Sequence, residues 1–594
     1  MDGRPLARGV ESRQRFSRIF SLGDRKNPSS WTPGIVLGIN DPELPISIAP
    51  FSSRRNSSSI PANISISTRG NFCFPFDTPD TWTSMEGLVL PPSLAESDSG
   101  TFSEGEEVLL VSWQSLHHDI KLNDKNLEPS IVVLVDSPQL VKNQGLLIDA
   151  IDTIRTKFPS SLIWTPGIAG PDNCALLTWM GIDLFDLSRS RSASAIGVLL
   201  STLGPREIDY TVSESSDMDA QCAEWKRSIS ATRAAIREGS LRELAEMQST
   251  SSSKSVEHLR LHDLKMRELG GGRSGLSRVL GNSATLRCNS FTSRSDALIQ
   301  DWHNRVSNFH TPPNHQTNVL LLLPCSAMKP YRLSQSHQRF AKSINTRGVH
   351  EVIVTAPLGL VPRELEDIWP AGNYDIPVTG DWDKDEIYII KNMVKKISNR
   401  TNYSRIINHS GIKIEIEGID IKDTRKGLSA GCSESLSNLS IEIDNAILDF
   451  NIPKMKESLH RLEKLKSLSR FQHGCDLWLN DTSVEGRPPI FTIKNNGIQL
   501  AQWNPRSARF AFSKSCLPIL DKYGTLSRVY LRNDHIWKGD LFSTNVESIE
   551  GDIRRGDEVL VYQNNLLIGS ARADAPGWEW PNGPGRLGRA QHRL

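Results

Sequence analysis

The segment Leu320–Phe340, LLLLPCSAMKPYRLSQSHQRF, combines an apolar strand, a polar loop and the start of a helix. The continuous apolar run ending at Pro324 is typical of a strand buried on both faces, as in parallel α/β sheets. Ser334 suits the N-cap of the following helix, because its hydroxyl can accept a hydrogen bond from a free backbone N–H. Ligands of open α/β sheets bind outside the carboxyl ends of the strands. We therefore expect a binding crevice at this loop.

The loop carries four chemically able side chains, Cys325, Lys329, Ser334 and His337. A cysteine near a helix N-terminus and a lysine has a lowered pKa and can attack as thiolate. His337 titrates near neutrality and can move protons, while Lys329 can stabilise negative charge or, if desolvated, act as a nucleophile. Tyr331 can stack on a flat base. A lone cysteine after a strand is more often a core residue, but the group as a whole favours a nucleophilic catalytic site without defining its substrate.

The rest of the chain changes character along its length. Residues 1–60 are polar and Ser-rich and predict little structure, and residues 249–255 with the glycines at 270–272 resemble a linker. Strand and helix patterns alternate over 85–200 and again over 295–400, which predicts parallel sheets or a barrel. After residue 400 short strands predominate, interrupted by a helix at 453–468, and about the last 75 residues indicate a small β-barrel.

Composition narrows the function classes. The 594 residues correspond to about three to five domains, and 69 Lys+Arg against 68 Asp+Glu leave a net charge of +1. Any nucleic-acid site must therefore be a local patch. The eight cysteines form no C-x-x-C pair, which argues against a disulfide scaffold and a self-contained zinc site and favours a reducing cytoplasm. No apolar run predicts a membrane span, and the N-terminus lacks the apolar core of a signal peptide.

The loop has the form P-C-x-x-x-K-P-Y-x-x-S-x-x-H over Pro324–His337, which resembles the signature of archaeosine synthase, an archaeal paralogue of tRNA-guanine transglycosylase. By domain order the resemblance extends over about residues 60–594. It implies a cytoplasmic enzyme acting on tRNA that carries 7-cyano-7-deazaguanine at position 15, adding an amine to the nitrile. Pro324, Pro330 and Tyr331 would contact substrate, and Cys325 would form a thioimide, by analogy with nitrile reductases of this base.

The resemblance leaves the amine donor open between lysine, which we favour, and glutamine or ammonia. With lysine, a radical-SAM partner enzyme would cleave the adduct to archaeosine. No cofactor is implied for the addition itself. Transglycosylase relatives suggest a homodimer.

Residues 165–190, TPGIAGPDNCALLTWMGIDLFDLSRS, resemble the transglycosylase barrel segment whose Phe-Asp pair carries the nucleophilic aspartate. Asp186 occupies that position. The Pro-Thr-Arg that normally follows and the Asp-Ser-Gly-Gly-Phe-Gln base-recognition segment are missing, so base exchange is predicted to be lost. We expect a degenerate barrel retained for tRNA or base binding, with Asp186 contacting substrate. The alternative is a helix-capping or surface carboxylate.

The transglycosylase zinc site also departs from its pattern. The family's C-x-C-x-x-C and later His are reduced here to Cys222, with His258 and His262 as weak further candidates. A closed zinc site needs four ligands, so we predict that this one is lost.

The segment 539–576, GDLFSTNVESIEGDIRRGDEVLVYQNNLLIGSARADAP, resembles a PUA domain, with a hairpin through Asn564–Asn565. The resemblance implies binding of structured RNA. Five arginines of this region are predicted to contact phosphate: Arg554, Arg555, Arg572, Arg586 and Arg589. The alternative is a basic tail without a partner. Trp578 and Trp580 are expected to pack rather than to stack on a base.

Taken together, these patterns predict a multidomain α/β and β fold. After the poorly structured residues 1–60, a degenerate TIM-like transglycosylase barrel with an appendage covers 61–290. A second α/β domain with the catalytic loop covers 291–400, a small α+β domain 401–517, and a β-barrel PUA domain 518–594. The competing functions are an active transglycosylase and a non-catalytic tRNA-binding protein.

Overall fold

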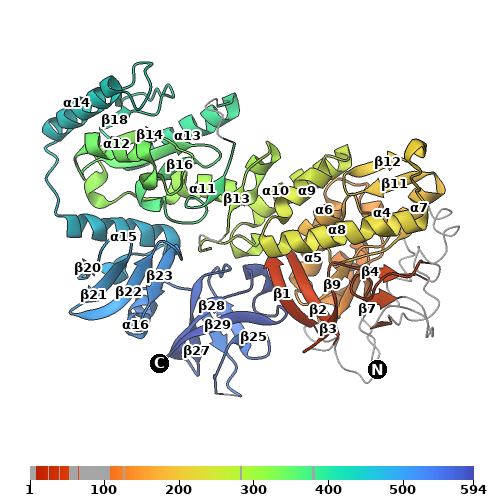
Figure 1. Cartoon of the computed structure of the whole chain (residues 1–594). Coiled ribbons are helices and arrows are strands. Elements are labelled where there is room, and N and C mark those ends of the chain that lie inside the picture. Colours follow the sequence, from red (N-terminus) through yellow and green to blue (C-terminus); the bar gives the residue numbers. More distant parts are fainter. Residues whose placement is uncertain are drawn as a thin grey trace. The chain divides into compact units, whose positions relative to one another are not determined.

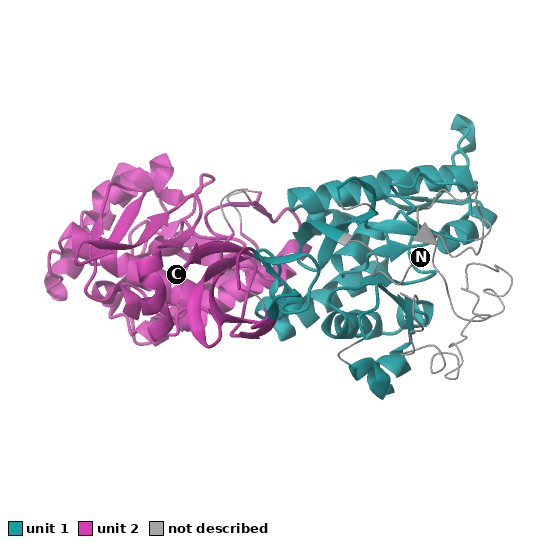
Figure 2. Ribbon diagram, turned by 90° about the horizontal axis from the view of Figure 1, so that it is seen from below, with its two compact units in different colours: residues 1–275, 540–546, 574–588 teal, residues 276–539, 547–573, 589–594 magenta. Residues whose placement is uncertain are grey.

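The computed structural model of the chain describes residues 8–23, 26–38, 41–52, 64–65, 108–124, 127–280, 284–377, 382–534 and 536–594. The chain forms two compact units, coloured separately in Figure 2. Unit 1 comprises Met1–Gly275, Asp540–Val546 and Asp574–Gly588, and unit 2 comprises Leu276–Gly539, Glu547–Ala573 and Arg589–Leu594. The predicted single domain over 518–594 is thus divided between the two units. The predicted multidomain α/β and β class is confirmed.

Unit 1 begins with regular structure where the sequence predicts little. Strands β1 (Arg8–Gln14), β2 (Ser17–Gly23) and β3 (Pro28–Trp31) form an antiparallel sheet. The expectation for residues 1–60 is therefore wrong over this stretch. The physical reason is that a few apolar side chains among the Arg and Ser residues are fully buried, including Ile19, Phe20 and Leu22.

A seven-stranded parallel sheet follows in unit 1, in the order β6-β5-β4-β10-β9-β8-β7. Its strands are β4 (Gly34–Leu37), β5 (Phe51–Ser52), β6 (Ile64–Ser65), β7 (Val108–Val111), β8 (Ile131–Leu134), β9 (Leu162–Trp164) and β10 (Leu184–Phe185). The first of these strands pairs in parallel with the last, through Leu184↔Gly34 and Phe185↔Ile35. A β/α barrel has this pairing of first and last strand. Within the described residues β6 and β7 remain edges, so the closed TIM-like barrel stays a prediction.

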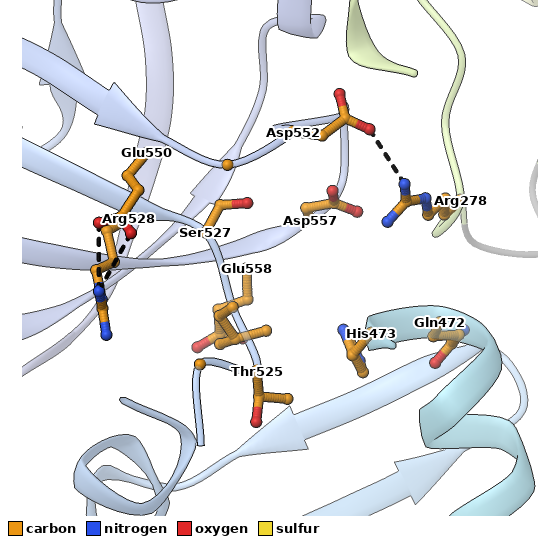
Figure 3. A pocket seen from close by; sticks show the side chains of 13 residues that line it. Arg278, Gln472, His473, Thr525, Ser527, Arg528, Glu550, Asp552, Asp557 and Glu558 are labelled. Carbon is orange, nitrogen blue, oxygen red and sulfur yellow. Dashed lines mark hydrogen bonds and ion pairs between the residues drawn. The ribbon is translucent and has the colours of Figure 1, made fainter. Parts of the chain in front are cut away.

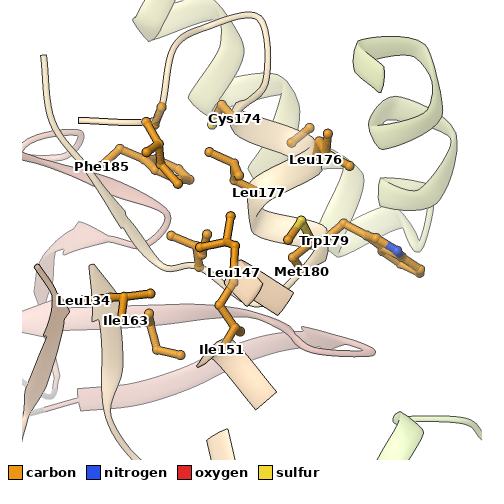
Figure 4. Packing of buried hydrophobic residues seen from close by; sticks show 14 of the residues in the cluster. Leu134, Leu147, Ile151, Ile163, Cys174, Leu176, Leu177, Trp179, Met180 and Phe185 are labelled. Atoms are coloured by element: carbon orange, nitrogen blue, oxygen red, sulfur yellow. The ribbon is translucent and has the colours of Figure 1, made fainter. Parts of the chain in front are cut away.

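Helices cover this sheet, and apolar side chains from both layers interdigitate. Figure 4 shows Leu147 and Ile151 of one helix facing Leu134 and Ile163 of the strands. The helices are α3 (Trp113–His118), α4 (Ser137–Leu140), α5 (Leu146–Lys157), α6 (Cys174–Trp179), α7 (Ser188–Ala195), α8 (Met218–Glu238), α9 (Leu241–Ser249) and α10 (Ser253–Leu269). A hairpin of β11 (Val198–Ser201) and β12 (Gly204–Glu207) follows α7. The predicted linker over 249–255 instead contains the N-cap of α10, where the Ser252 hydroxyl accepts from the Ser255 N–H at 3.1 Å.

Unit 2 contains a five-stranded sheet in the order β16-β15-β14-β18-β19. Figure 1 labels β14, β16 and β18 of this sheet. The strands are β14 (Val319–Pro324), β15 (His350–Thr355), β16 (Gly359–Pro362), β18 (Arg405–Asn408) and β19 (Asp420–Asp423). The chain leaves β14 toward β15 on one side and later returns to β18 on the other, and both neighbours are parallel to β14. The carboxyl end of β14 is therefore a topological switch point, where such sheets bind ligands.

The predicted elements around the catalytic loop are confirmed. The loop leads into α12 (Gln335–Ile344), and α13 (Lys384–Thr401) and α14 (Ser433–Asp449) complete the layer structure. Apolar side chains of β14, α12 and α14, among them Leu321, Phe340 and Ile443, share one core. Helix α14 has no counterpart in the sequence analysis.

Unit 2 also contains the helices α11 (Ala297–Asn304), before the five-stranded sheet, and α15 (Glu457–His473), after α14. The chain that follows α15 is mostly β-structure. An antiparallel sheet contains β20 (Ser483–Glu485), β21 (Phe491–Asn495), β22 (Ile498–Asn504) and β23 (Arg509–Phe512), followed by α16 (Leu517–Lys522). Strands β24 (Arg528–Leu531), β27 (Glu558–Gln563) and β28 (Leu566–Ala573) lie side by side. The predicted hairpin is confirmed, since Asn564 and Asn565 both have positive φ between β27 and β28. In unit 1, β25 (Leu541–Phe542) pairs with the start of β29 (Arg586–Arg593).

No helix in the described part of the chain combines the length and apolar character needed to cross a membrane.

Candidate active site

A cleft of about 950 Å³ opens in unit 2 at the carboxyl ends of the central strands. Pro324 and Cys325 follow from β14, Thr355 is the last residue of β15, and Ser410 comes shortly after β18. The other chemically relevant lining residues are Cys288, Arg294, Lys329, Tyr374, Trp382, Asp383, Glu386, Lys391, Lys413 and Arg425. The binding crevice predicted from the loop is therefore present, at the switch point of the sheet.

Cys325 is half-buried and lines this cleft. Burial raises the pKa of its thiol, and a hydrogen bond with the Thr355 side chain and the nearby Lys329 charge act in the opposite direction. The sequence predicts a lowered pKa for the Cys325 thiol, whereas its surroundings in the structure raise it. A thiolate at Cys325 forms only when a neighbouring group takes the proton, and Lys329 is the basic group whose charge acts on it.

The Lys329 ammonium lies over the ring of Tyr374, with Nζ 4.2 Å from the ring centroid. Burial lowers the pKa of this ammonium, while Cys325 and Asp375 raise it. Desolvation of this kind gives the amine a larger neutral fraction, so Lys329 can accept a proton as well as donate one. Cys325 and Lys329 thus form a possible proton-transfer pair.

Neither Ser334 nor His337 lines the cleft, and both support the structure of the loop instead. Ser334 is the N-cap of α12, as predicted, and its hydroxyl accepts from the His337 N–H at 3.3 Å. The His337 ring is buried, and its Nδ1 accepts from an Arg363 guanidinium N–H at 2.9 Å. Burial, and then the Arg363 charge, lower the pKa of His337 to about 3. The predicted role of His337 in moving protons near neutrality therefore does not fit its surroundings.

Tyr331 is fully buried, so the predicted stacking on a flat base is not supported. Its hydroxyl contacts the hydroxyl of Tyr374 and donates to Thr355 Oγ1 at 3.2 Å. Through this network it supports the cleft wall. Pro330 is half-buried outside the cleft lining, while Pro324 lines it.

Two ion pairs hold the loop in place. Arg332 pairs with Asp367 at 2.6 Å, and its backbone N–H donates to Glu366 at 3.1 Å. Glu366 also pairs with Arg363 at 3.0 Å. Arg363 is the residue that contacts His337. The loop is thus fixed at both its middle and its helical end.

Thr355, Tyr374, Ser410 and Arg425 are site residues that sequence reasoning missed. Thr355 and Ser410 occur at the ends of strands, which is the signal that could have found them once the strand order was known. Arg425 donates to the carbonyls of Ser410 and Leu428 at 3.0 and 2.8 Å and so braces the cleft rim.

Asp186 follows β10 in unit 1 and is 1% exposed. Its carboxylate accepts backbone N–H groups of Gly167 and Ser188, both at 2.8 Å, and the Trp164 indole N–H at 3.4 Å. Of the two alternatives, the capping one fits the structure, since Ser188 begins α7. The predicted contact with substrate gains no support.

The weak zinc candidates do not converge. In the described residues, the group of three or more possible metal ligands found within 4.8 Å of one another is His310, His350 and Glu364. Cys222 is buried in α8, and the His258 ring instead contacts the Val141 carbonyl at 3.2 Å. His262 packs edge-on against Phe16.

The predicted RNA-binding arginines are only partly available. Arg554 pairs with Asp552 at 2.9 Å and is 5% exposed, Arg586 pairs with Asp574 at 2.6 Å, and Arg572 faces Glu558 at 3.7 Å. Arg555 is half-buried and Arg589 is exposed. Trp580 is buried and Trp578 stacks on Phe16, which agrees with the expected packing role of both.

A second pocket of about 250 Å³ lies in unit 2 next to β24 and β27 (Figure 3). Its two arginines already face carboxylates, Arg278 with Asp552 at 3.1 Å and Arg528 with Glu550 at 3.2 Å. Burial raises the pKa of Asp557 in this pocket to about 6. So many acidic groups disfavour a phosphate ligand here.

Comparison with known proteins confirms the resemblance that the loop predicts. A family model described as "Domain of unknown function (DUF5591)" matches residues 299–443, which contain the cleft and its loop. The archaeosine synthase of Methanocaldococcus jannaschii is 29% identical over 472 residues, covering 77% of this chain and 78% of the relative. The archaeosine synthase subunits alpha of Methanosarcina acetivorans and Thermoplasma acidophilum are 26% and 25% identical, covering 74% and 83% of this chain and 76% and 94% of theirs.

The chain is therefore similar to archaeosine synthases over most of its length. A solved PUA-domain protein of Thermoplasma acidophilum aligns with 22% of this chain at 19% identity and a TM-score of 0.18, which is too low for an argument about fold. The PUA assignment rests on the sequence pattern.

Proposed function

We propose that this chain is a tRNA-modifying transferase of archaeosine biosynthesis, which adds an amine to the nitrile of 7-cyano-7-deazaguanine at position 15 of tRNA. The observation that carries the proposal is the placement of Cys325 and Lys329 together in one cleft at the switch point of the sheet. Similarity to archaeosine synthases supports the substrate. The reaction needs no cofactor.

In the proposed first step, Lys329 takes the thiol proton of Cys325 and the sulfur attacks the nitrile carbon. A C–S bond forms, one π bond of the nitrile breaks, and its nitrogen receives the proton from the Lys329 ammonium. The product is a thioimidate. In the second step the donor amine attacks the same carbon, the C–S bond breaks, and Cys325 leaves as thiolate and regains a proton lost by the amine. Atoms and charges balance, and the base carries an amidine.

Lysine is the donor we favour, with glutamine or ammonia as alternatives. The cleft lining contains both cationic and acidic side chains, including Lys413, Arg425 and Asp383, which suit a zwitterionic amino acid. With lysine, a separate radical-SAM enzyme would complete the conversion. Transglycosylase activity is not favoured, because the Asp186 carboxylate is buried and occupied by hydrogen bonds.

The test uses nitrile-bearing tRNA with labelled lysine, glutamine or ammonia in separate reactions. We expect label transfer from one donor, and a loss of about 10³-fold or more in Cys325→Ala. With the donor omitted, mass spectrometry should find the thioimidate on Cys325. Cys475→Ser is the matched control, because Cys475 is also half-buried but lies outside the cleft lining. Absence of transfer from all three donors contradicts the proposal, and full activity of Cys325→Ala contradicts covalent catalysis.

A further inference from the structure

Three buried side chains from separate segments of unit 2 meet away from the cleft lining. His310 follows the π-helical turn Arg305–Phe309, His350 is the first residue of β15, and Glu364 lies in the 3-10 helical turn Arg363–Leu365. The side chains of all three are at most 2% exposed. Their possible ligand atoms all lie within 4.8 Å of one another.

The spacing of these atoms matches the edges of a metal tetrahedron. His310 Nε2 and His350 Nε2 lie 2.9 and 3.3 Å from the same oxygen, Glu364 Oε1. Ser467 Oγ of α15 lies 3.4 Å from both His310 Nε2 and Glu364 Oε1. Zinc bonds of about 2.0–2.1 Å to nitrogen and oxygen place tetrahedral ligands about 3.3 Å apart. Four of the six edges of a tetrahedron are therefore already close to the expected length.

The hydrogen bonding of Glu364 is incomplete without a cation. Both imidazoles face Oε1, whereas the buried Oε2 has no hydrogen-bond partner among the described residues. A buried carboxylate is costly unless a cation compensates its charge. A divalent cation bonded to this carboxylate would supply that compensation.

The surroundings of His350 fit a metal ligand. Its other ring nitrogen, Nδ1, lies 2.5 Å from the hydroxyl oxygen of Tyr403. A histidine that binds metal through Nε2 carries a proton on Nδ1 and donates it to such a partner, which fixes the ring orientation. Tyr403 can accept this hydrogen bond.

We propose that His310, His350 and Glu364, with the Ser467 hydroxyl as fourth ligand, bind one structural zinc ion. Two imidazoles and one carboxylate form a ligand set that zinc accepts, and burial leaves no open position for substrate. The ion ties α15 to the turn Arg363–Leu365. The neighbouring Arg363 contacts His337, so the ion stabilises the support of the catalytic loop.

The test measures metal in the full-length chain purified without chelators. Wild-type protein is expected to contain about one zinc per chain, and Glu364→Gln and His350→Ala to contain less than a tenth of that. Replacement with Co²⁺ should give the visible absorption of a tetrahedral site in wild-type protein and none in His350→Ala. Circular dichroism of both variants shows whether they remain folded.

Two controls locate the ion. His460→Ala removes one member of another close histidine pair, in which His460 Nδ1 lies 2.9 Å from His315 Nε2. Among the described residues no carboxylate completes a three-ligand group with this pair, so the variant should keep the zinc. Cys222→Ser tests the weaker candidate in unit 1 and should also keep it. Wild-type protein that stays metal-free after incubation with Zn²⁺ overturns the proposal. So does zinc that survives in folded Glu364→Gln and His350→Ala, or that is lost in Cys222→Ser.

Discussion

At the scale of single residues, the loop pattern predicts catalytic roles for both Lys329 and His337, but their different burial gives them different roles. Lys329 faces the cleft with its pKa lowered, which makes its amine a usable base. His337 is neutral and enclosed, with its Nδ1 lone pair engaged by Arg363. We infer that Lys329 moves the proton and that His337 positions the loop.

Lys329→Arg tests this division. Arginine keeps the charge but cannot lose its proton, so the rate of amine addition should fall by about 10²–10³-fold. In wild-type protein the rate should rise as the pH passes through the lowered pKa of Lys329, and this rise should be absent in the variant. Rates measured across pH on nitrile-bearing tRNA check both. The exposed Lys342 on α12, changed to Ala, is the control and should leave the profile unchanged.

His337→Gln should change stability more than chemistry. The native ring stays neutral down to a pKa of about 3, whereas the unfolded ring binds a proton below about 6.5. Between these values the unfolded state binds more protons, so stability falls as the pH is lowered through this window. The variant should lose this part of the acid sensitivity, on the order of a few kcal/mol, and retain at least a tenth of the activity. Urea unfolding at several pH values measures it, with the exposed His118→Gln as control.

At the scale of elements, the strand–loop–helix from β14 to α12 could be predicted from its pattern. The apolar run, the N-cap at Ser334 and the amphipathic α13 are local features, and each has the predicted form. Strand order is not local. Thr355 and Ser410 reach the cleft because β15 and β18 flank β14, and nothing near either residue encodes that pairing. The burial of Tyr331 and His337 likewise depends on elements distant in sequence, which is why both were predicted to face substrate.

Ser334→Ala should destabilise the first turn of α12. Loss of the hydrogen bond to the His337 N–H costs about 1 kcal/mol, whereas Ser334→Asp should preserve the cap. Chemical unfolding gives the free-energy difference. A loss of activity in Ser334→Ala that Ser334→Asp also shows would contradict a purely capping role and indicate direct contact with substrate.

At the scale of the whole molecule, unit 1 is assembled from three separated stretches of chain. Glu579, from the third stretch, is buried and pairs with Arg13 at 2.9 Å and Arg18 at 3.9 Å. Burial lowers the pKa of Arg18 to about 9, a sign of how poorly solvated this guanidinium is. The N-terminal strands therefore depend on a carboxylate supplied from near the other end of the chain.

Glu579→Gln should destabilise unit 1 by about 3–5 kcal/mol, because it removes one partner of a buried charge cluster. Glu11→Gln breaks an exposed ion pair with Arg237 in the same unit and should cost under about 1 kcal/mol. Thermal and urea unfolding of the two variants compare them directly. Equal effects would mean that Glu579 contributes no more than a surface charge.

Two features of unit 1 can form only at different stages of synthesis. The parallel pairing of β4 with β10 needs the chain up to residue 185, whereas the ion pair of Arg13 with Glu579 needs the chain up to residue 579. Once residue 185 has left the ribosome, all strands of the seven-stranded sheet are available, and Asp183 already lies 4.0 Å from Arg18 in the folded unit. Glu579, which pairs with Arg13 at 2.9 Å, is then still untranslated. Glu579 is synthesised only after the first two stretches of unit 2, Leu276–Gly539 and Glu547–Ala573. A chain that ends before Asp574 lacks the Glu579 carboxylate, and we expect its strands β1 and β2 to be less stable than those of the full chain.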